Sequence, residues 1–443
     1  MLTADQAQNI ALDLVTRARR FGAESCDVVY SGDASTDVQI RLGRLEDVTR
    51  AEGEEVSLRV FIGQRSASSA SSDLSTQALD ALAERVVAMA REVPEDPYAG
   101  LAPKDMLLRG TLPALDLDDG VDVSPTALRE RALEAEDAAR TVKGVSNSEG
   151  GSASAGRGVM ALATSDGFAG SYTSSSHGIS ASVIAGEGND MQRDYSYHSV
   201  RHLTDLDPAT AIGRQAGERA VARLGASQMQ SGTLQVVFDP RVGSSLLGHL
   251  IGAITGGAIA RKTSFLLDAL GTQLFAHGIS IIDEPHRLRG QRSRPFDGEG
   301  LPTAATNIVE DGVLTTWLID AAAARQLGTK PTGHSMRSGA GPSNLHMAAG
   351  SVTPKELMTD IKTGFYVTDL IGMGVNGLTG DYSRGASGFM IENGVLTRAV
   401  NEVTIAGNLK DMFAALIPAD DLVFRYAINT PTLRIDGMTL AGA

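Results

Sequence analysis

Histidine is the side chain in this sequence best suited to bind a metal, and the chain has eight of them. His198 and His202 are four residues apart, which on a helix would place both rings on one face. They follow Tyr195-Ser196-Tyr197, a pattern typical of a strand, and residues four apart on a strand share a face but lie far from each other. We therefore expect two separate surface or hydrogen-bonded rings. Four further histidines fall in separate turns, and no HExxH motif occurs.

Two glycine-rich segments resemble nucleotide or nucleophile motifs only superficially. Gly333–Gly339 lacks the lysine of a phosphate-binding loop, and Arg384–Gly388 misplaces its serine for a GxSxG nucleophile turn. The wider segment Gly380–Gly388 is dense in glycine, serine and aspartate. Two interpretations stay open: a loop that binds the backbone of an extended peptide, or a turn that needs glycines with positive φ. Its candidate peptide-binding residues are Asp381, Tyr382, Ser383, Arg384 and Ser387.

Gly248, Gly252 and Gly256 recur every four residues and would form a bare stripe along a helix. We expect another backbone to pack closely against this stripe, within the same domain in the favoured interpretation and across a dimer interface in the alternative. The surrounding span 242–260 is the most apolar in the chain, but it contains five glycines and several polar residues. It therefore indicates a buried helix rather than a membrane span.

Several helices are predicted by their starting signals. An amphipathic pattern with capping-box spacing covers residues 3–21, and a second helix runs from about Thr76 and stops before Pro94. A cap followed by proline begins further helices at Ser124-Pro125, at Asp207-Pro208 and at Thr353-Pro354.

Strands and helices fall in separate blocks along the chain. Alternating apolar residues predict strands near 38–42 and 56–62, and residues 144–202 read as antiparallel sheet. Asp311-Gly312 and Asn393-Gly394, each between apolar runs, predict hairpins in the second half. The fold class is therefore α+β. We expect an N-terminal domain over 1–226, with antiparallel sheet and helices, and a mostly β domain with a few helices over 232–443.

Composition excludes several classes of function. The formal net charge is −14 with no Lys/Arg stripe, so we expect no nucleic-acid binding. Cys26 is the only cysteine, which excludes an internal disulfide and any multi-cysteine zinc cluster. The first residues show no basic region followed by an apolar stretch, so we expect no signal peptide, no membrane association and a cytoplasmic location.

Many blocks of the chain, in order, resemble the TldD/PmbA family, and specifically its PmbA (TldE) branch. The resemblance is nearly full length. It is carried by Arg41–Asp47, Gly248–Ala253, Arg261–Leu266, Arg294–Gly300, Lys330–His334, Gly380–Phe389 and Glu402–Leu409.

The resemblance implies a degenerate zinc motif in this chain. In the zinc-bearing TldD branch a helix carries HExxxH, and a cysteine near the C-terminus completes the site, so that the metal activates water and the glutamate takes its proton. Those motif positions fall on Gly248, His249 and Ala253, and 424–429 contains no cysteine. We therefore expect no catalytic residue, metal or cofactor in this chain.

The family also implies a partner. A PmbA-type chain pairs with a TldD-type zinc subunit, around a cavity in which unfolded peptides are hydrolysed, as in toxin-peptide maturation and antitoxin turnover. The zinc is expected in that partner, and whether the isolated chain forms a homodimer stays open. The family name "modulator of DNA gyrase" describes an effect of such processing.

Two other hypotheses remain beside this one. The chain could be a self-sufficient hydrolase with an unrecognised site, for which Asp381, Ser383, Arg384 and Ser387 are the candidates. It could also be a protein that binds peptides or gyrase without hydrolysis.

Overall fold

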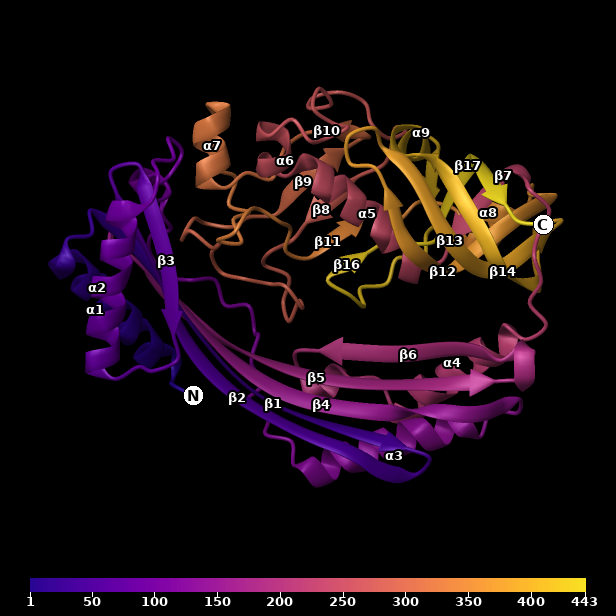
Figure 1. The fold of residues 1–443 in the computed structure, drawn as a ribbon. Helices are drawn as coiled ribbons and strands as arrows, with labels where there is room; N and C mark the ends of the chain where they lie inside the picture. The colour runs from indigo at the N-terminus through magenta and orange to yellow at the C-terminus, as the bar shows by residue number, and fades with distance from the viewer.

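The N-terminal half is built on one long, curved, antiparallel sheet in a computed structural model that describes all 443 residues (Figure 1). Its strand order is β3-β2-β1-β4-β5-β6. The long central strands pair over almost their whole length, so that Asp27 lies opposite both Arg59 and Thr164. The strands are β1 Ser25–Arg41, β2 Arg44–Ile62, β3 Arg65–Ser71, β4 Val145–Thr164, β5 Ala169–Ala185 and β6 Gln192–Val200.

Four helices cover the convex face of this sheet and leave the concave face toward the C-terminal half (Figure 1). They are α1 Ala4–Phe21, α2 Thr76–Glu92, α3 Pro125–Arg140 and α4 Ala209–Ala222. The capping box of Thr3 with Gln6 and the Ser124 cap before Pro125 are confirmed. The Asp207-Pro208 start is shifted: α4 begins at Ala209 behind Pro208, which provides no side-chain cap.

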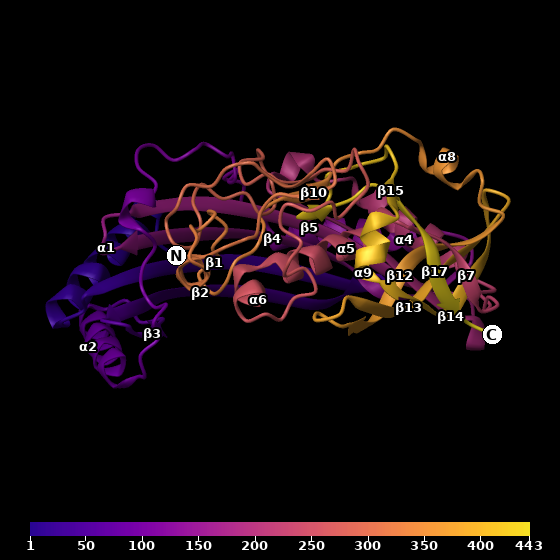
Figure 2. The same ribbon diagram turned by 90° about the horizontal axis from the view of Figure 1, so that it is seen from above.

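The C-terminal half contains two smaller sheets, and Figure 2 shows it lying along the N-terminal sheet. In the larger sheet the order is β14-β13-β12-β7-β17-β15, and β14 also pairs with β17, which closes the sheet into a barrel-like layer. Its strands are β7 Gly232–Phe238, β12 Thr363–Val375, β13 Asp381–Glu392, β14 Val395–Asn408, β15 Leu416–Pro418 and β17 Leu433–Ala441.

The other sheet has the order β10-β9-β8-β11-β16. Its strands are β8 Ile281–Asp283, β9 Thr306–Glu310, β10 Val313–Leu314, β11 Leu345–Met347 and β16 Ile428–Asn429. The helices of this half are α5 Pro240–Ile254, α6 Gly256–Ala260, α7 Ala321–Leu327, α8 Pro354–Met358 and α9 Leu409–Ala414. Both halves combine helices with mainly antiparallel sheets, and only the pairs β7–β12 and β11–β16 are parallel, so the expected α+β class is confirmed.

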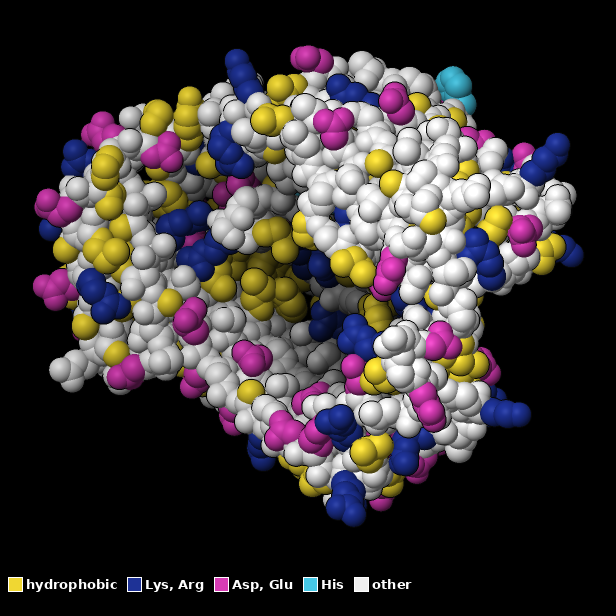
Figure 3. All heavy atoms as spheres, turned by 45° about the vertical axis from the view of Figure 1, so that its right-hand side comes forward, with side chains coloured by type: hydrophobic (Ala, Val, Ile, Leu, Met, Phe, Trp, Pro, Cys, Tyr) yellow, Lys and Arg dark blue, Asp and Glu magenta, His cyan; other side chains and the backbone are white.

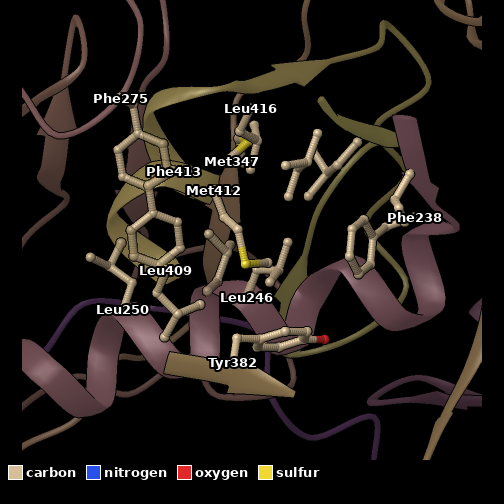
Figure 4. Packing of buried hydrophobic residues seen from close by; sticks show 14 of the residues in the cluster. Phe238, Leu246, Leu250, Phe275, Met347, Tyr382, Leu409, Met412, Phe413 and Leu416 are labelled. Carbon is tan, nitrogen blue, oxygen red and sulfur yellow. The ribbon is translucent and has the colours of Figure 1, made fainter. Parts of the chain in front are cut away.

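The largest hydrophobic cluster, of 36 buried residues, lies in the C-terminal half and fixes the position of α5. Leu246 and Leu250 of α5 point into it, toward Phe413 of α9 and Tyr382 of β13 (Figure 4). One face of α5 is thus buried against the barrel, and burial of each such side chain contributes roughly 1.5–3 kcal/mol.

Both Xaa-Gly turns form the expected hairpins. Asp311 and Gly312 have φ of 48° and 81° between β9 and β10, and Asn393 and Gly394 have 51° and 80° between β13 and β14. Positive φ at both central residues is the geometry that Asp-Gly and Asn-Gly favour. No helix of the chain is long and apolar enough to cross a membrane, and the apolar span 242–260 divides into α5 and α6.

Candidate functional site

Helix α5 presents the degenerate motif positions on two different faces. The helix begins at Pro240, behind an Asp239 cap whose carboxylate accepts the Arg241 N–H at 2.9 Å. Gly248 is exposed, whereas Ala253 is buried in the hydrophobic cluster. Residues 248 and 253 therefore lie in different environments, and neither has a side chain that could bind a metal ion.

The favoured expectation, that the glycine stripe packs within its own domain, is wrong for two of its three members, and the alternative of a dimer interface stays a prediction. A Cβ placed on Gly248 or Gly252 would meet no atom within 4 Å, so this part of α5 faces open space. A Cβ on Gly256 would lie 2.7 Å from the Cβ of Ala323 in α7, closer than side chains approach. Only Gly256 packs within the domain, because α6 there crosses close to α7.

Substitution by alanine should change the stability of the chain in opposite directions at Gly252 and at Gly256. Gly252→Ala should stabilise the isolated chain by about 0.5–1 kcal/mol, because alanine favours the helix and finds free space. Gly256→Ala should destabilise it by about 1–3 kcal/mol through overpacking against Ala323. Urea unfolding of both variants beside the wild type measures this difference. Equal shifts for the two variants would contradict the packing described here.

His249 is held against an aromatic ring rather than among metal ligands. Its ring lies edge-to-face on Tyr382, with centroids 5.9 Å apart. Its Nε2 and the Tyr382 hydroxyl are both buried without a hydrogen-bond partner. Burial, together with the charge of nearby Arg384, lowers the pKa of His249. The ring is therefore neutral at pH 7, and no group of three or more His, Cys, Asp or Glu residues in the chain is arranged to hold a metal ion.

The Gly380–Gly388 segment is mostly a strand rather than a loop, and a peptide-binding role for its side chains stays a prediction. Residues 381–392 form β13, paired on one edge with β12 and on the other with β14. Its backbone N–H groups therefore already face paired strands and are not free to bind a peptide. Of its glycines only Gly380 has positive φ, 83°.

Strand geometry divides the five candidate peptide-binding residues between environments. Asp381 and Ser383 are exposed, and the carboxylate of Asp381 accepts hydrogen bonds from Thr379 and Asn408 at 2.6 and 3.2 Å. Tyr382 is buried beside His249, and Arg384 lies on the same side of the strand. Ser387 is buried. The structure thus brings Tyr382 and Arg384 to α5 but does not gather all five at one site.

The histidines considered as metal ligands have separate partners. His198 accepts the Asp207 N–H at Nδ1, and the His202 ring contacts the Asp116 carbonyl at 3.0 Å. His334 lies 3.0 Å from the Thr332 hydroxyl and 3.5 Å from the Asp283 carboxylate, with both side chains buried. Each of these three rings is held by a polar partner of its own, whereas His346 has a buried Nδ1 without a hydrogen-bond partner.

A hollow that the sequence did not predict lies between the concave sheet and the C-terminal loops. It has a volume of about 470 Å³ and is lined by strands β1, β4 and β5 on one side and by segments near 292–298 and 335–342 on the other. Figure 3 shows an opening between the two halves, with hydrophobic and Lys/Arg side chains gathered around it. Its only sequence signal is local: four arginines fall within 287–294.

Three domain models of one family match this chain in succession. They are PmbA/TldA metallopeptidase domain 1 over residues 26–90, the central domain over 118–224 and the C-terminal domain over 231–442. The fold and its domain order are thus those of a metallopeptidase family.

Similar proteins extend over the whole chain. Metalloprotease PmbA of Escherichia coli O157:H7 is 38% identical over 99% of this chain and 96% of its own length, and the PmbA homologue of Haemophilus influenzae is 36% identical over the same shares. A crystal structure from Bacteroides thetaiotaomicron, described as a candidate modulator of DNA gyrase, is 29% identical, covers 100% of both chains and has a TM-score of 0.93. TldE from Thermococcus kodakarensis shares the fold, with a TM-score of 0.87, 18% identity, and coverage of 98% of this chain and 100% of its own. The chain belongs to the PmbA/TldD metallopeptidase family.

Proposed function

We propose that this chain is the non-zinc subunit of a two-subunit peptidase, in which a TldD-type partner holds the zinc and cleaves unfolded peptides in the cytoplasm. The observation that carries the proposal is the set of side chains on α5 at the positions that resemble HExxxH. Gly248 has no side chain, Ala253 turns a methyl group into the core, and His249 packs on Tyr382.

Peptide hydrolysis by a zinc-bound water requires metal-binding side chains that α5 and segment 424–429 do not supply. A catalytic zinc needs three protein ligands beside its water, and a base must accept the proton of that water. Segment 424–429 provides no cysteine. Cys26 lies in the core of the N-terminal sheet, where burial raises the pKa of its thiol to about 12, so it is not a thiolate ligand.

The surface around α5 supports a role for a partner. Gly248 and Gly252 leave one side of the helix bare. In the neighbouring β12–β13 hairpin, Ile371, Met373 and Leu378 expose most of their apolar surface, with Met373 84% exposed. Clustered apolar residues on a surface mark an interaction site. A second protein chain, either the TldD-type partner or a second copy of this one, would cover them.

Reconstitution tests the proposal. The untagged chain alone should carry no stoichiometric zinc and should leave unfolded peptides intact. Mixing it with a family member that contains HExxxH should produce a complex on size exclusion, one zinc per pair, and chelator-sensitive cleavage. Changing the partner's motif glutamate should abolish turnover, whereas His249→Ala here should preserve it, because His249 approaches no metal-binding group. Cleavage by this chain alone, insensitive to chelators, would establish an autonomous hydrolase instead.

A second candidate is a peptide-binding or gyrase-modulating protein without hydrolysis. The observation that favours it is the full-length similarity to the Bacteroides thetaiotaomicron protein described as a candidate gyrase modulator. Binding of peptide without cleavage, even beside the zinc-bearing partner, would support this candidate over the first.

A further inference from the structure

The hollow between the two halves of the molecule has one apolar wall and one cationic wall. Met160 and Leu162 of β4, Tyr172 of β5 and Phe296 form the apolar side, with the Tyr172 and Phe296 rings 5.7 Å apart in an edge-to-face contact. Guanidinium groups from three segments form the other side: Arg201, Arg292, Arg294 and Arg337. A volume of about 470 Å³ is in the range of small-molecule and peptide-end pockets.

Arg201, just beyond the end of β6, is half-buried and has no carboxylate partner. It donates to two backbone carbonyl oxygens, those of Ser175 at 3.1 Å and of Gln291. Its Nε is buried and has no hydrogen-bond partner. Burial lowers the pKa of Arg201, and Tyr172 is the only titratable neighbour that opposes this effect.

Arg294 and Arg292 add two more guanidiniums without ion pairs. Arg294 donates to the Ser343 hydroxyl at 3.0 Å and to the carbonyls of Ser335 and Gly341 at 3.3 and 3.1 Å. Burial lowers its pKa, although the charges of Asp283 and Asp297 oppose this effect, and the positive charge of Arg292 adds to it. The Arg292 guanidinium is exposed, makes no hydrogen bond within the chain and borders the hollow.

The acidic groups around the hollow are already occupied. Asp27 accepts hydrogen bonds from both Arg59 and Arg337, so its single charge is shared by two cations. Asp297 accepts three backbone N–H bonds, from Glu299, Leu301 and Ser335. Asp297 attracts Arg294 without forming an ion pair with it, and Arg201 and Arg292 have no ion pair either. Cations without an ion pair in a semi-buried site favour an anion from outside.

We propose that this hollow binds a carboxylate attached to an apolar group, namely the C-terminal carboxylate of a peptide whose last side chain is apolar. The planar guanidinium fork matches a carboxylate in two parallel hydrogen bonds. The apolar wall of Met160, Leu162, Tyr172 and Phe296 accepts the terminal side chain. The choice of a peptide rests on the proposed function, which makes peptides the ligands of the complex; the carboxylate and apolar recognition rests on the hollow alone.

Calorimetry with the isolated full chain tests the site. The probe is the tripeptide Ala-Ala-Phe with a free carboxylate, compared with its C-terminal amide. The acid should bind at least about tenfold more tightly, because only the acid forms charge-assisted hydrogen bonds. N-acetyl-phenylalanine distinguishes a peptide end from a free small acid, and equal affinity for it would assign the hollow to small apolar acids. Equal affinity for acid and amide, no binding at millimolar tripeptide, or full displacement by 10 mM phosphate would overturn the proposal.

A variant locates the binding within the hollow. Arg292→Gln removes a charge without breaking any internal hydrogen bond, so it should fold normally and weaken binding of the acid by about five- to tenfold. It should leave the weak affinity for the amide unchanged. Arg129→Gln is the matched control, because Arg129 is an exposed arginine of α3 on the opposite face of the sheet. Equal affinities in the two variants would show that the carboxylate binds elsewhere.

The site and the proposed function can fail independently. Tripeptide binding by a chain that never supports cleavage with a zinc-bearing partner would keep the binding site and reject the subunit role. Partner-dependent cleavage by a chain that does not distinguish acid from amide would do the reverse.

Discussion

Replacing Asp27 with alanine is expected to lower the free energy of unfolding by about 3–5 kcal/mol, because two largely buried arginines would lose the carboxylate with which they form ion pairs. Asp27 lies on β1 and is 2% exposed. Its Oδ2 accepts from Arg59 of β2 at 2.8 and 2.5 Å, and its Oδ1 accepts from Arg337 at 2.9 Å. Arg337 belongs to the C-terminal half, so one carboxylate joins the two halves of the molecule.

The two arginines depend on Asp27 to different degrees. Burial opposes the charge of Arg59, but Asp27 outweighs it and the pKa of Arg59 is raised. Arg337 donates a single hydrogen bond to Asp27, and burial lowers the pKa of Arg337. We therefore expect Arg337→Leu to cost less than Asp27→Ala, since Arg59 still satisfies the carboxylate after the Arg337 change.

Urea unfolding at pH 7 measures this effect, with Asp33→Ala as the matched control. Asp33 is an exposed aspartate on the same strand, and its removal should change stability by no more than about 0.5 kcal/mol. If Asp27→Ala were no more costly than Asp33→Ala, the carboxylate would not hold the two halves together.

Local signals in the sequence predicted local structure well. The capping boxes, the Ser-Pro helix start and the two Xaa-Gly hairpins depend on neighbouring residues, and each appears where it was expected. The Asp207-Pro208 start failed by one residue, because Pro208 itself takes the cap position.

Features that depend on contacts between distant segments could not be predicted in the same way. The glycine stripe gave no means of knowing that Gly256 meets α7 while Gly252 meets open space. The composition of Gly380–Gly388 is that of a turn, yet the residues form a strand because β12 and β14 supply partners on both edges. The arginine-lined hollow forms only because Arg201, at the end of β6, lies beside the 292–294 loop. These two segments are about ninety residues apart in the sequence.

Glu299 should make the chain less stable as the pH rises from about 5 to 8. Its side chain is 7% exposed, and Oε2 accepts the N–H of Ala321 at the start of α7, at 2.9 Å. Burial is the largest cause that raises the pKa of Glu299, to about 7, and the neighbouring Asp297 adds to it.

The direction follows from proton binding. Between the ordinary glutamate pKa of 4.5 and the folded value of about 7, the folded chain holds a proton that the unfolded chain has released. Stability therefore falls with rising pH across this window, by about 3 kcal/mol in total. Burial also raises the pKa of Asp297, which contributes a loss of the same sign.

Glu299→Gln isolates this contribution, because glutamine keeps the acceptor for the Ala321 N–H and carries no charge at any pH. The variant should lose less stability than the wild type between pH 5 and 8 and should exceed it by about 2–3 kcal/mol at pH 8. Glu310→Gln, at an exposed position of β9, removes one carboxylate outside this buried site and should give a curve parallel to the wild type. Because the Arg59 charge acts on Glu299 and opposes the rise in its pKa, the Asp27→Ala background should strengthen that attraction and reduce the gain from Glu299→Gln. If the free energy of unfolding of Glu299→Gln followed the same pH dependence as the wild type, or if the variant were less stable at pH 8, ionisation of the buried carboxylate would not destabilise the fold.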